Sequence, residues 1–129
     1  MSLRLVIPGC IRSKKNSKRI YATGRFKKVL PSKAYELWEA GARASALDQL
    51  TQWHCPVIYM GGCAVNAQIY FKGQRPDLSG ALESIGDCFE GILWENDKQI
   101  ESWDGSRLIH DKDNPRVELE VEPFTACED

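Results

Sequence analysis

Two aspartates, Asp77 and Asp97, stand where carboxylates commonly carry out metal chemistry. Asp77 follows a predicted strand and precedes a predicted helix, which holds a side chain rigidly yet leaves it open to solvent. Asp97 comes after that helix, just before the next predicted strand. Carboxylates at one sheet edge repel each other without a cation, and hard oxygen ligands suit Mg²⁺ or Mn²⁺. The spacing leaves open whether the two side chains meet, because the helix between them is about 16 Å long.

Three more acidic residues lie on that predicted helix. Glu83 is about one turn from the helix start, and it is either a third ligand or a solvated side chain. For Asp87 and Glu90 we favour the simpler interpretation, in which they form a solvated acidic face.

Positive charge is concentrated near the N-terminus. The first 35 residues hold ten basic and no acidic side chains, whereas the other 94 hold seven basic and 18 acidic ones. Such a segment binds nucleic acid or an anionic membrane surface, or it packs as a solvated edge against the acidic part of the fold. A membrane surface is the weakest of these, because the segment has turn residues and short strand runs. The expected DNA-binding residues are Arg12, Lys14, Lys15, Asn16, Lys18, Arg19, Arg25, Lys27, Lys28, Lys72 and Arg75.

The first half of the chain predicts a strand, a basic hairpin and a helix. The strand covers 3–7, and the hairpin turns at Thr23-Gly24 and ends at Pro31. The helix runs from Lys33 to about residue 50, with Ser32 as its N-cap. Its expected buried stripe is Tyr35, Trp38, Ala42 and Ser45.

The second half supplies the elements that must position the acids. Strict alternation predicts a half-buried strand over 63–72, and apolar residues at helical spacing predict a helix over 80–90 with Ser79 as its N-cap. The segment 99–110 reads as a strand or a hairpin bent at Asp104-Gly105. A last strand covers 117–122, and the tail 123–129 is expected to fray. This order predicts an α+β fold with one mixed β-sheet and two main helices.

Length and composition fit one domain spanning 1–129. At 129 residues the chain can bury a sufficient core without disulfide or metal staples. Its five cysteines are irregularly spaced and form no C-x-x-C pair, so they are expected as buried free thiols in a reducing compartment. No apolar run approaches a membrane span and no signal peptide is evident, so we expect a cytoplasmic protein.

The stretch RPDLSGALESIGDCFEGILWENDKQI, residues 75–100, resembles the signature of the RusA-type Holliday junction resolvases, small endodeoxyribonucleases of phages and prophages. That signature begins Pro-Asp-Leu-Asp-Asn, continues with a Lys and an Asp, and ends with Gly, Trp and Asp-Asp-x-Gln-Ile. The segments IPGCIRSKKNSKRI and LPSKAYELWE are also similar to the family, so the resemblance spans most of the chain. The matching residues, in register without a gap, are Pro76, Asp77, Leu78, Asp87, Gly91, Trp94, Asp97, Gln99 and Ile100.

Four positions depart from the family pattern. The second Asp, the Asn, the Lys and the first Asp of the terminal pair are replaced by Ser79, Gly80, Glu83 and Asn96. Ser79 and Asn96 still offer neutral oxygens or hydrogen bonds to the ligands. The lost cation has candidate replacements in Lys72, Arg75 and Lys98.

The resemblance implies an endodeoxyribonuclease that resolves four-way junctions in recombination, repair or phage DNA processing inside a bacterial or phage-infected cell. It implies Mg²⁺ dependence, with Mn²⁺ as a substitute, and the expected catalytic and metal-binding residues are Asp77, Asp97 and Glu83. Two matched cuts in a nearly twofold junction imply a C2 homodimer, with the last strands or the first helix as its interface.

Two other functions remain open. The replacements at Ser79 and Glu83 are compatible with a protein of the same fold that binds branched DNA without cutting it. A small interaction protein whose basic edge docks an acidic partner is the third alternative.

Overall fold

The fold is built on a mixed five-stranded sheet. The computed structural model describes residues 2–12, 18–23, 26–31, 33–53 and 61–124. The main sheet has the strand order β1-β7-β4-β5, and β6 also pairs with β4. Two helices complete the α+β class that the sequence predicts. The strands are β1 (Leu3–Pro8), β4 (Cys63–Phe71), β5 (Ile100–Ser102), β6 (Arg107–His110) and β7 (Arg116–Pro123).

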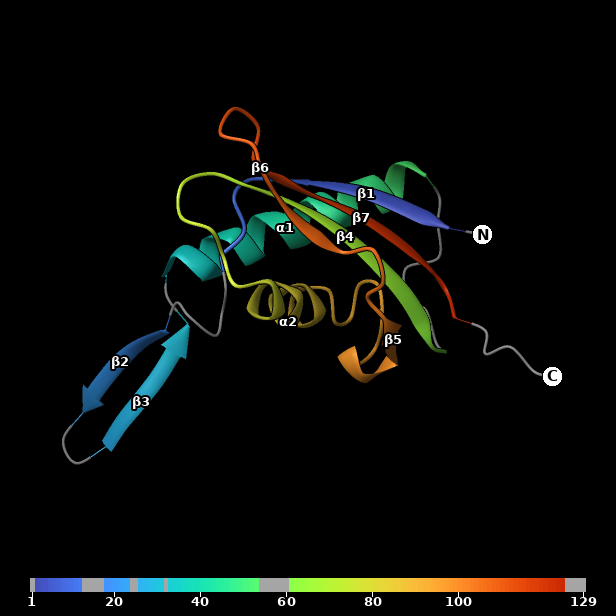
Figure 1. The fold of residues 1–129 in the computed structure, drawn as a ribbon. Helices are drawn as coiled ribbons and strands as arrows, with labels where there is room; N and C mark the ends of the chain where they lie inside the picture. Colours follow the sequence, from blue (N-terminus) through green and yellow to red (C-terminus); the bar gives the residue numbers. More distant parts are fainter. Residues whose placement is uncertain (1, 13–17, 24–25, 32, 54–60, 125–129) are drawn as a thin grey trace.

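Both helices, α1 (Lys33–Gln52) and α2 (Leu78–Cys88), cover one face of this sheet (Figure 1). The strict alternation of β4 gives the cause, because every second side chain, such as Val65 and Ile69, is buried against the helices. The opposite face carries half-buried polar residues, such as Asn66 and Glu120. No helix in the described ranges is long and apolar enough to cross a membrane.

Helix α1 buries the predicted stripe and extends it. Tyr35, Trp38 and Ala42 are buried as predicted, whereas Ser45 is half-buried and the stripe continues through Ala46 and Leu50. Gln49 joins the helix to edge strand β1, since its side chain accepts from Val6 N–H at 3.0 Å and donates to Val6 O at 2.8 Å. The predicted cap Ser32 lies outside the described residues.

Helix α2 begins earlier than the sequence predicts, at Leu78, and the N-cap is Asp77 in place of Ser79. The Asp77 carboxylate accepts from Gly80 N–H at 3.3 Å, which satisfies one of the unpaired donors of the first turn. A negative side chain at this end also favours the positive pole of the helix dipole. The helix ends at Cys88, short of the predicted Glu90.

The segment 99–110 forms no hairpin of its own. Strands β5 and β6 both pair parallel with β4, one after the other along the same edge. The bend predicted at Asp104-Gly105 exists as a turn closed by Ser106 N–H donating to Trp103 O at 3.1 Å. Parallel pairing depends on the crossover through α2, which periodicity alone does not reveal.

The basic hairpin is confirmed as β2 (Lys18–Thr23) paired antiparallel with β3 (Phe26–Pro31). It forms a separate two-stranded sheet and extends away from the main sheet (Figure 1). At the other end of the chain, Phe124 N–H still donates to Gly62 O at 2.9 Å, and residues 125–129 lie outside the described ranges.

Replacing Gly105 with Ala is expected to destabilise the protein by roughly 1–3 kcal/mol. Gly105 has a φ of +85°, and a Cβ there would overlap the Asn66 side-chain amide. That amide donates to Asp104 O at 3.3 Å, so it cannot move away without losing a bond. Urea denaturation measures the change. Gly73→Ala is the matched control, because Gly73 has a φ of +76° but no atom near a new Cβ; equal losses for both variants would contradict the steric argument.

Candidate active site

A groove of about 260 Å³ lies between α2 and the short 3-10 helix η1 (Asp97–Gln99). It brings together two predicted ligands, Glu83 and Asp97, with Ser79, the residue at the lost family carboxylate. Its remaining wall is mostly apolar and includes Trp103. Carboxylates on an apolar, partly enclosed wall are well suited to bind a cation. The lining residues are Ser79, Leu82, Glu83, Gly86, Asp97, Ile100 and Trp103.

Asp97 is the first residue of η1, and a capping box fixes that helix. Asn96 Oδ1 accepts from Lys98 N–H at 2.9 Å, and Gln99 Oε1 accepts from Asn96 N–H at 3.0 Å. Gln99 also donates to Gly61 O at 2.8 Å, which ties the turn to the start of β4. Asn96, which replaces a family aspartate, therefore orders the turn that bears Asp97.

Close packing against α2 also fixes the turn that bears Asp97. Gly86 lets Asp97 approach, because a Cβ on Gly86 would lie 3.4 Å from Asp97 Cβ. Trp94 is fully buried and its indole donates to Gly86 O at 2.8 Å. The Trp94 ring also meets Phe89 edge to face, with 6.4 Å between centroids. Gly86 and Trp94 thus position Asp97, a role that residue type and spacing alone do not reveal.

Asp97 lies in a cluster with Asp87 and Glu90. These three side chains offer carboxylate oxygens that all lie within 4.8 Å of one another. Asp87 and Glu90 are half-buried beside Asp97, so both carboxylates remain partly solvated. Three carboxylates at this spacing repel one another, and such a hard-oxygen donor set fits Mg²⁺ or Mn²⁺. The sequence marks Gly91 only as the end of the helix, and in the structure this residue has a φ of +82° in the turn between α2 and Asp97.

Asp77 lies at the other end of α2. Its carboxylate caps the first turn and accepts from Ser79 Oγ at 3.2 Å. Asp97 packs on Gly86 in the later part of the helix, roughly 13 Å along its axis from Asp77 at 1.5 Å per residue. Among the described residues, the three-acid cluster includes neither Asp77 nor Glu83. The ligand set Asp77, Glu83 and Asp97 stays a prediction.

The predicted DNA-binding residues fall into two groups. Arg12, Lys72 and Arg75 are exposed, and Cys10 Sγ lies 3.9 Å from Lys72 O, which brings the start of the basic segment beside the loop that leads to α2. The hairpin lies on the same side of the molecule as the start of α2 (Figure 1). It carries Lys18 and Arg19 on β2 and Lys27 and Lys28 on β3, whereas Lys14, Lys15, Asn16 and Arg25 lie outside the described residues.

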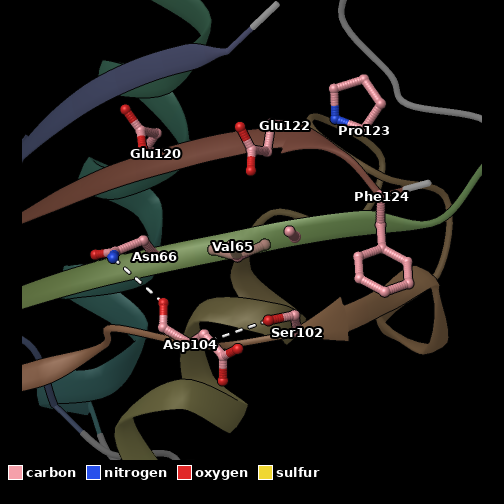
Figure 2. Close-up of a pocket in the computed structure, with 9 residues that line it drawn as sticks. Val65, Asn66, Ser102, Asp104, Glu120, Glu122, Pro123 and Phe124 are labelled. Atoms are coloured by element: carbon pink, nitrogen blue, oxygen red, sulfur yellow. Dashed lines mark hydrogen bonds between the residues drawn. The ribbon is translucent and has the colours of Figure 1, made fainter. Parts of the chain in front are cut away.

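A second groove, of about 390 Å³, lies on the open face of the sheet. Figure 2 shows Glu120 and Glu122 of β7 along one side and Asn66 of β4, which donates to Asp104 O, along the other. Its charged lining residues, Asp104 and the two glutamates, are all acidic. This surface repels phosphate, and it contains none of the predicted site residues.

Two of the described cysteines, Cys63 and Cys88, are buried and poorly suited to act as nucleophiles. Cys63 and Cys88 are buried free thiols as the sequence predicts, Cys10 is a free thiol that is only half-buried, and Cys55 and Cys127 lie outside the described residues. Burial raises the pKa of the Cys88 thiol to about 12, with a further increase from the Glu39 carboxylate nearby. Because the thiolate is the nucleophilic form, the Cys88 thiol is unreactive at neutral pH.

Comparison with known proteins agrees with the geometry. No curated protein matches the chain significantly. The family model described as endodeoxyribonuclease RusA matches residues 9–122, from the end of β1 into β7. The match includes the basic hairpin, α2 and the turn that bears Asp97. The chain therefore belongs to the RusA endodeoxyribonuclease family.

Proposed function

We propose that the protein is a Mg²⁺-dependent nuclease that resolves Holliday junctions by paired, symmetric cuts. Its family is one of structure-specific endonucleases that act on branched DNA and generally depend on divalent metal. The observation that carries the proposal is the placement of Asp97, which lines the groove with Glu83 and clusters with Asp87 and Glu90. Asp97 belongs to both candidate ligand sets, so it is the residue on which the chemistry depends most.

The bound cation would lower the pKa of a water and stabilise the charge of the transition state. Asp97 would hold it, together with Asp77 and Glu83 as the sequence predicts or with Asp87 and Glu90 as the cluster suggests. The apolar wall of Leu82, Ile100 and Trp103 limits the water around the reacting phosphate. No protein nucleophile is needed in either case.

The basic residues would hold the DNA arms through their phosphates. Such contacts set affinity and register without reading sequence, so junction binding should weaken steeply with salt. The exposed Lys72 and Arg75 precede Asp77 and would guide a backbone toward the groove. The acidic groove on the open face of the sheet would face away from the DNA.

We further propose a homodimer. A four-way junction presents two equivalent strands, and one site per chain cuts both only if two chains act together. Analytical ultracentrifugation of the protein alone and with a junction tests this part separately from cleavage.

The purified protein is expected to cut a synthetic four-way junction at paired, symmetric positions when Mg²⁺ is present, and to leave a linear duplex of the same sequence intact. Denaturing gels of end-labelled strands measure the cuts, and EDTA supplies the metal-free control. Junction binding without nicking in Mg²⁺ or Mn²⁺ would favour the non-catalytic branched-DNA-binding alternative. Equal binding to junction and duplex would favour the small interaction protein.

A further inference from the structure

We propose that Glu90 is a positioning residue that holds Asp97 in place, and that helix α1 holds Glu90 through Arg43. The catalytic consequence of this inference rests on the proposed nuclease function, whereas the positioning itself does not. A series of hydrogen bonds connects α1 to Asp97 through residues 88–90.

The series of hydrogen bonds begins at the C-terminal end of α2. The last four carbonyls of a helix have no partner within it and must find one elsewhere. Arg43 of α1 donates to Cys88 O at 2.6 Å and to Glu90 O at 3.1 Å from the same nitrogen, Nη1. A cation at a helix C-terminus is also favoured by the helix dipole. Arg43 therefore fixes the backbone at 88–90 against α1.

The Glu90 side chain makes the next hydrogen bond of this series. Glu90 Oε1 accepts from Asp97 N–H at 3.1 Å. As the first residue of η1, Asp97 has no helical acceptor for this N–H, and the Asn96 side chain is bonded to Lys98 N–H. Glu90 therefore satisfies the donor that the capping box leaves unpaired. Because this hydrogen bond is made by the backbone N–H of Asp97, it fixes the backbone position from which the Asp97 side chain extends.

The loop between the two residues is closed as well. Gly91 N–H donates to Trp94 O at 2.7 Å, and Glu90 and Trp94 form an isolated β-bridge. The backbone that carries the Glu90 side chain is thus fixed by Arg43 before residue 91 and by the closed turn after it. A misplacement of about 1 Å at a reacting centre can cost roughly 100-fold in rate, so an anchor of this kind matters for catalysis.

The test compares Glu90→Ala, which removes the acceptor, with Glu90→Gln, which keeps an oxygen acceptor but no charge. Exposed Glu95, whose carboxylate bonds to none of the described residues, provides the control Glu95→Ala. The first readout is the exchange rate of the Asp97 amide by NMR, and it requires neither metal nor DNA. The second is the Mg²⁺ concentration for half-maximal junction cleavage, with kcat measured at saturation.

Glu90→Ala is expected to speed Asp97 amide exchange several-fold, to raise the half-maximal Mg²⁺ concentration and to lower kcat about tenfold or more. Glu90→Gln should recover amide protection, because its side-chain oxygen can still accept from Asp97 N–H, and Glu95→Ala should match the original protein in both measurements. Unchanged amide exchange in Glu90→Ala would overturn the inference. A Glu90→Gln variant whose Asp97 amide exchanges as fast as that of Glu90→Ala would also overturn it, since a side-chain oxygen acceptor at this position would then not protect the amide. If the original protein cuts no junction, the proposed function fails while the amide readout still decides the positioning.

Discussion

Replacing Asp97 with Asn is expected to lower junction cleavage by on the order of a thousandfold, while junction affinity without Mg²⁺ stays within about twofold. Asparagine keeps the size and one oxygen but removes the charge that a hard cation requires. Several kcal/mol of transition-state stabilisation would be lost, and each 1.4 kcal/mol is about tenfold in rate. Single-turnover cleavage at saturating protein measures the change, and fluorescence anisotropy of a labelled junction in EDTA measures binding.

The matched control is Asp113→Asn, a substitution at an exposed aspartate in the turn between β6 and β7. It should cut at the original rate. Asp77→Asn and Asp87→Asn then separate the two candidate ligand sets, because each removes a carboxylate from only one of them. A loss confined to Asp77→Asn supports the set predicted from sequence, and a loss confined to Asp87→Asn supports the cluster. Normal cleavage by Asp97→Asn would contradict both.

Local patterns predicted most of the elements because they are set by short-range physics. The alternation of 63–72 correctly predicted β4, which ends at Phe71, and the predicted basic hairpin is present with Thr23 paired to Phe26. The start of α2 was misplaced because two neighbouring residues, Asp77 and Ser79, are both good caps. Asp77 is the N-cap because its carboxylate accepts a hydrogen bond from Gly80 N–H. The parallel pairing of β5 and β6 with β4 needed the three-dimensional crossover, which no local period encodes.

The candidate site was predictable only in part. Asp97 and Glu83 line one groove, whereas their role as metal ligands together with Asp77 stays a prediction. The partners nearest to Asp97 were missed, because exposed helix positions commonly carry acids and Asp87 and Glu90 matched that pattern. What singles them out is the return of the chain after Gly91, a left-handed residue with a φ of +82°. The direction in which the chain turns after Gly91 depends on how Trp94 packs against α2. The spacing of residues in the sequence does not reveal this packing.

The buried Trp94 is expected to be the most costly residue of the site to remove. Trp94→Ala should destabilise the protein by about 3–5 kcal/mol, because it leaves a cavity under the Asp97 turn and removes the edge-to-face contact with Phe89. Guanidinium denaturation followed by circular dichroism measures the loss. The control is Trp103→Ala, a half-buried tryptophan of the groove wall that should cost much less.

A second substitution removes the hydrogen bond at a smaller loss of packing, since Trp94→Phe keeps a six-membered aromatic ring but loses the indole N–H together with the five-membered ring. All four last carbonyls of α2 have partners: those of residues 85 and 87 accept backbone N–H groups, that of Cys88 accepts from Arg43, and that of Gly86 accepts from Trp94. Trp94→Phe leaves the Gly86 carbonyl buried without its partner, so a loss of about 1–3 kcal/mol is expected. Cleavage should fall by a larger factor than junction binding, because Gly86 is the residue on which Asp97 packs. Equal stability of Trp94→Phe and the original protein would mean that this bond does not hold the turn in place.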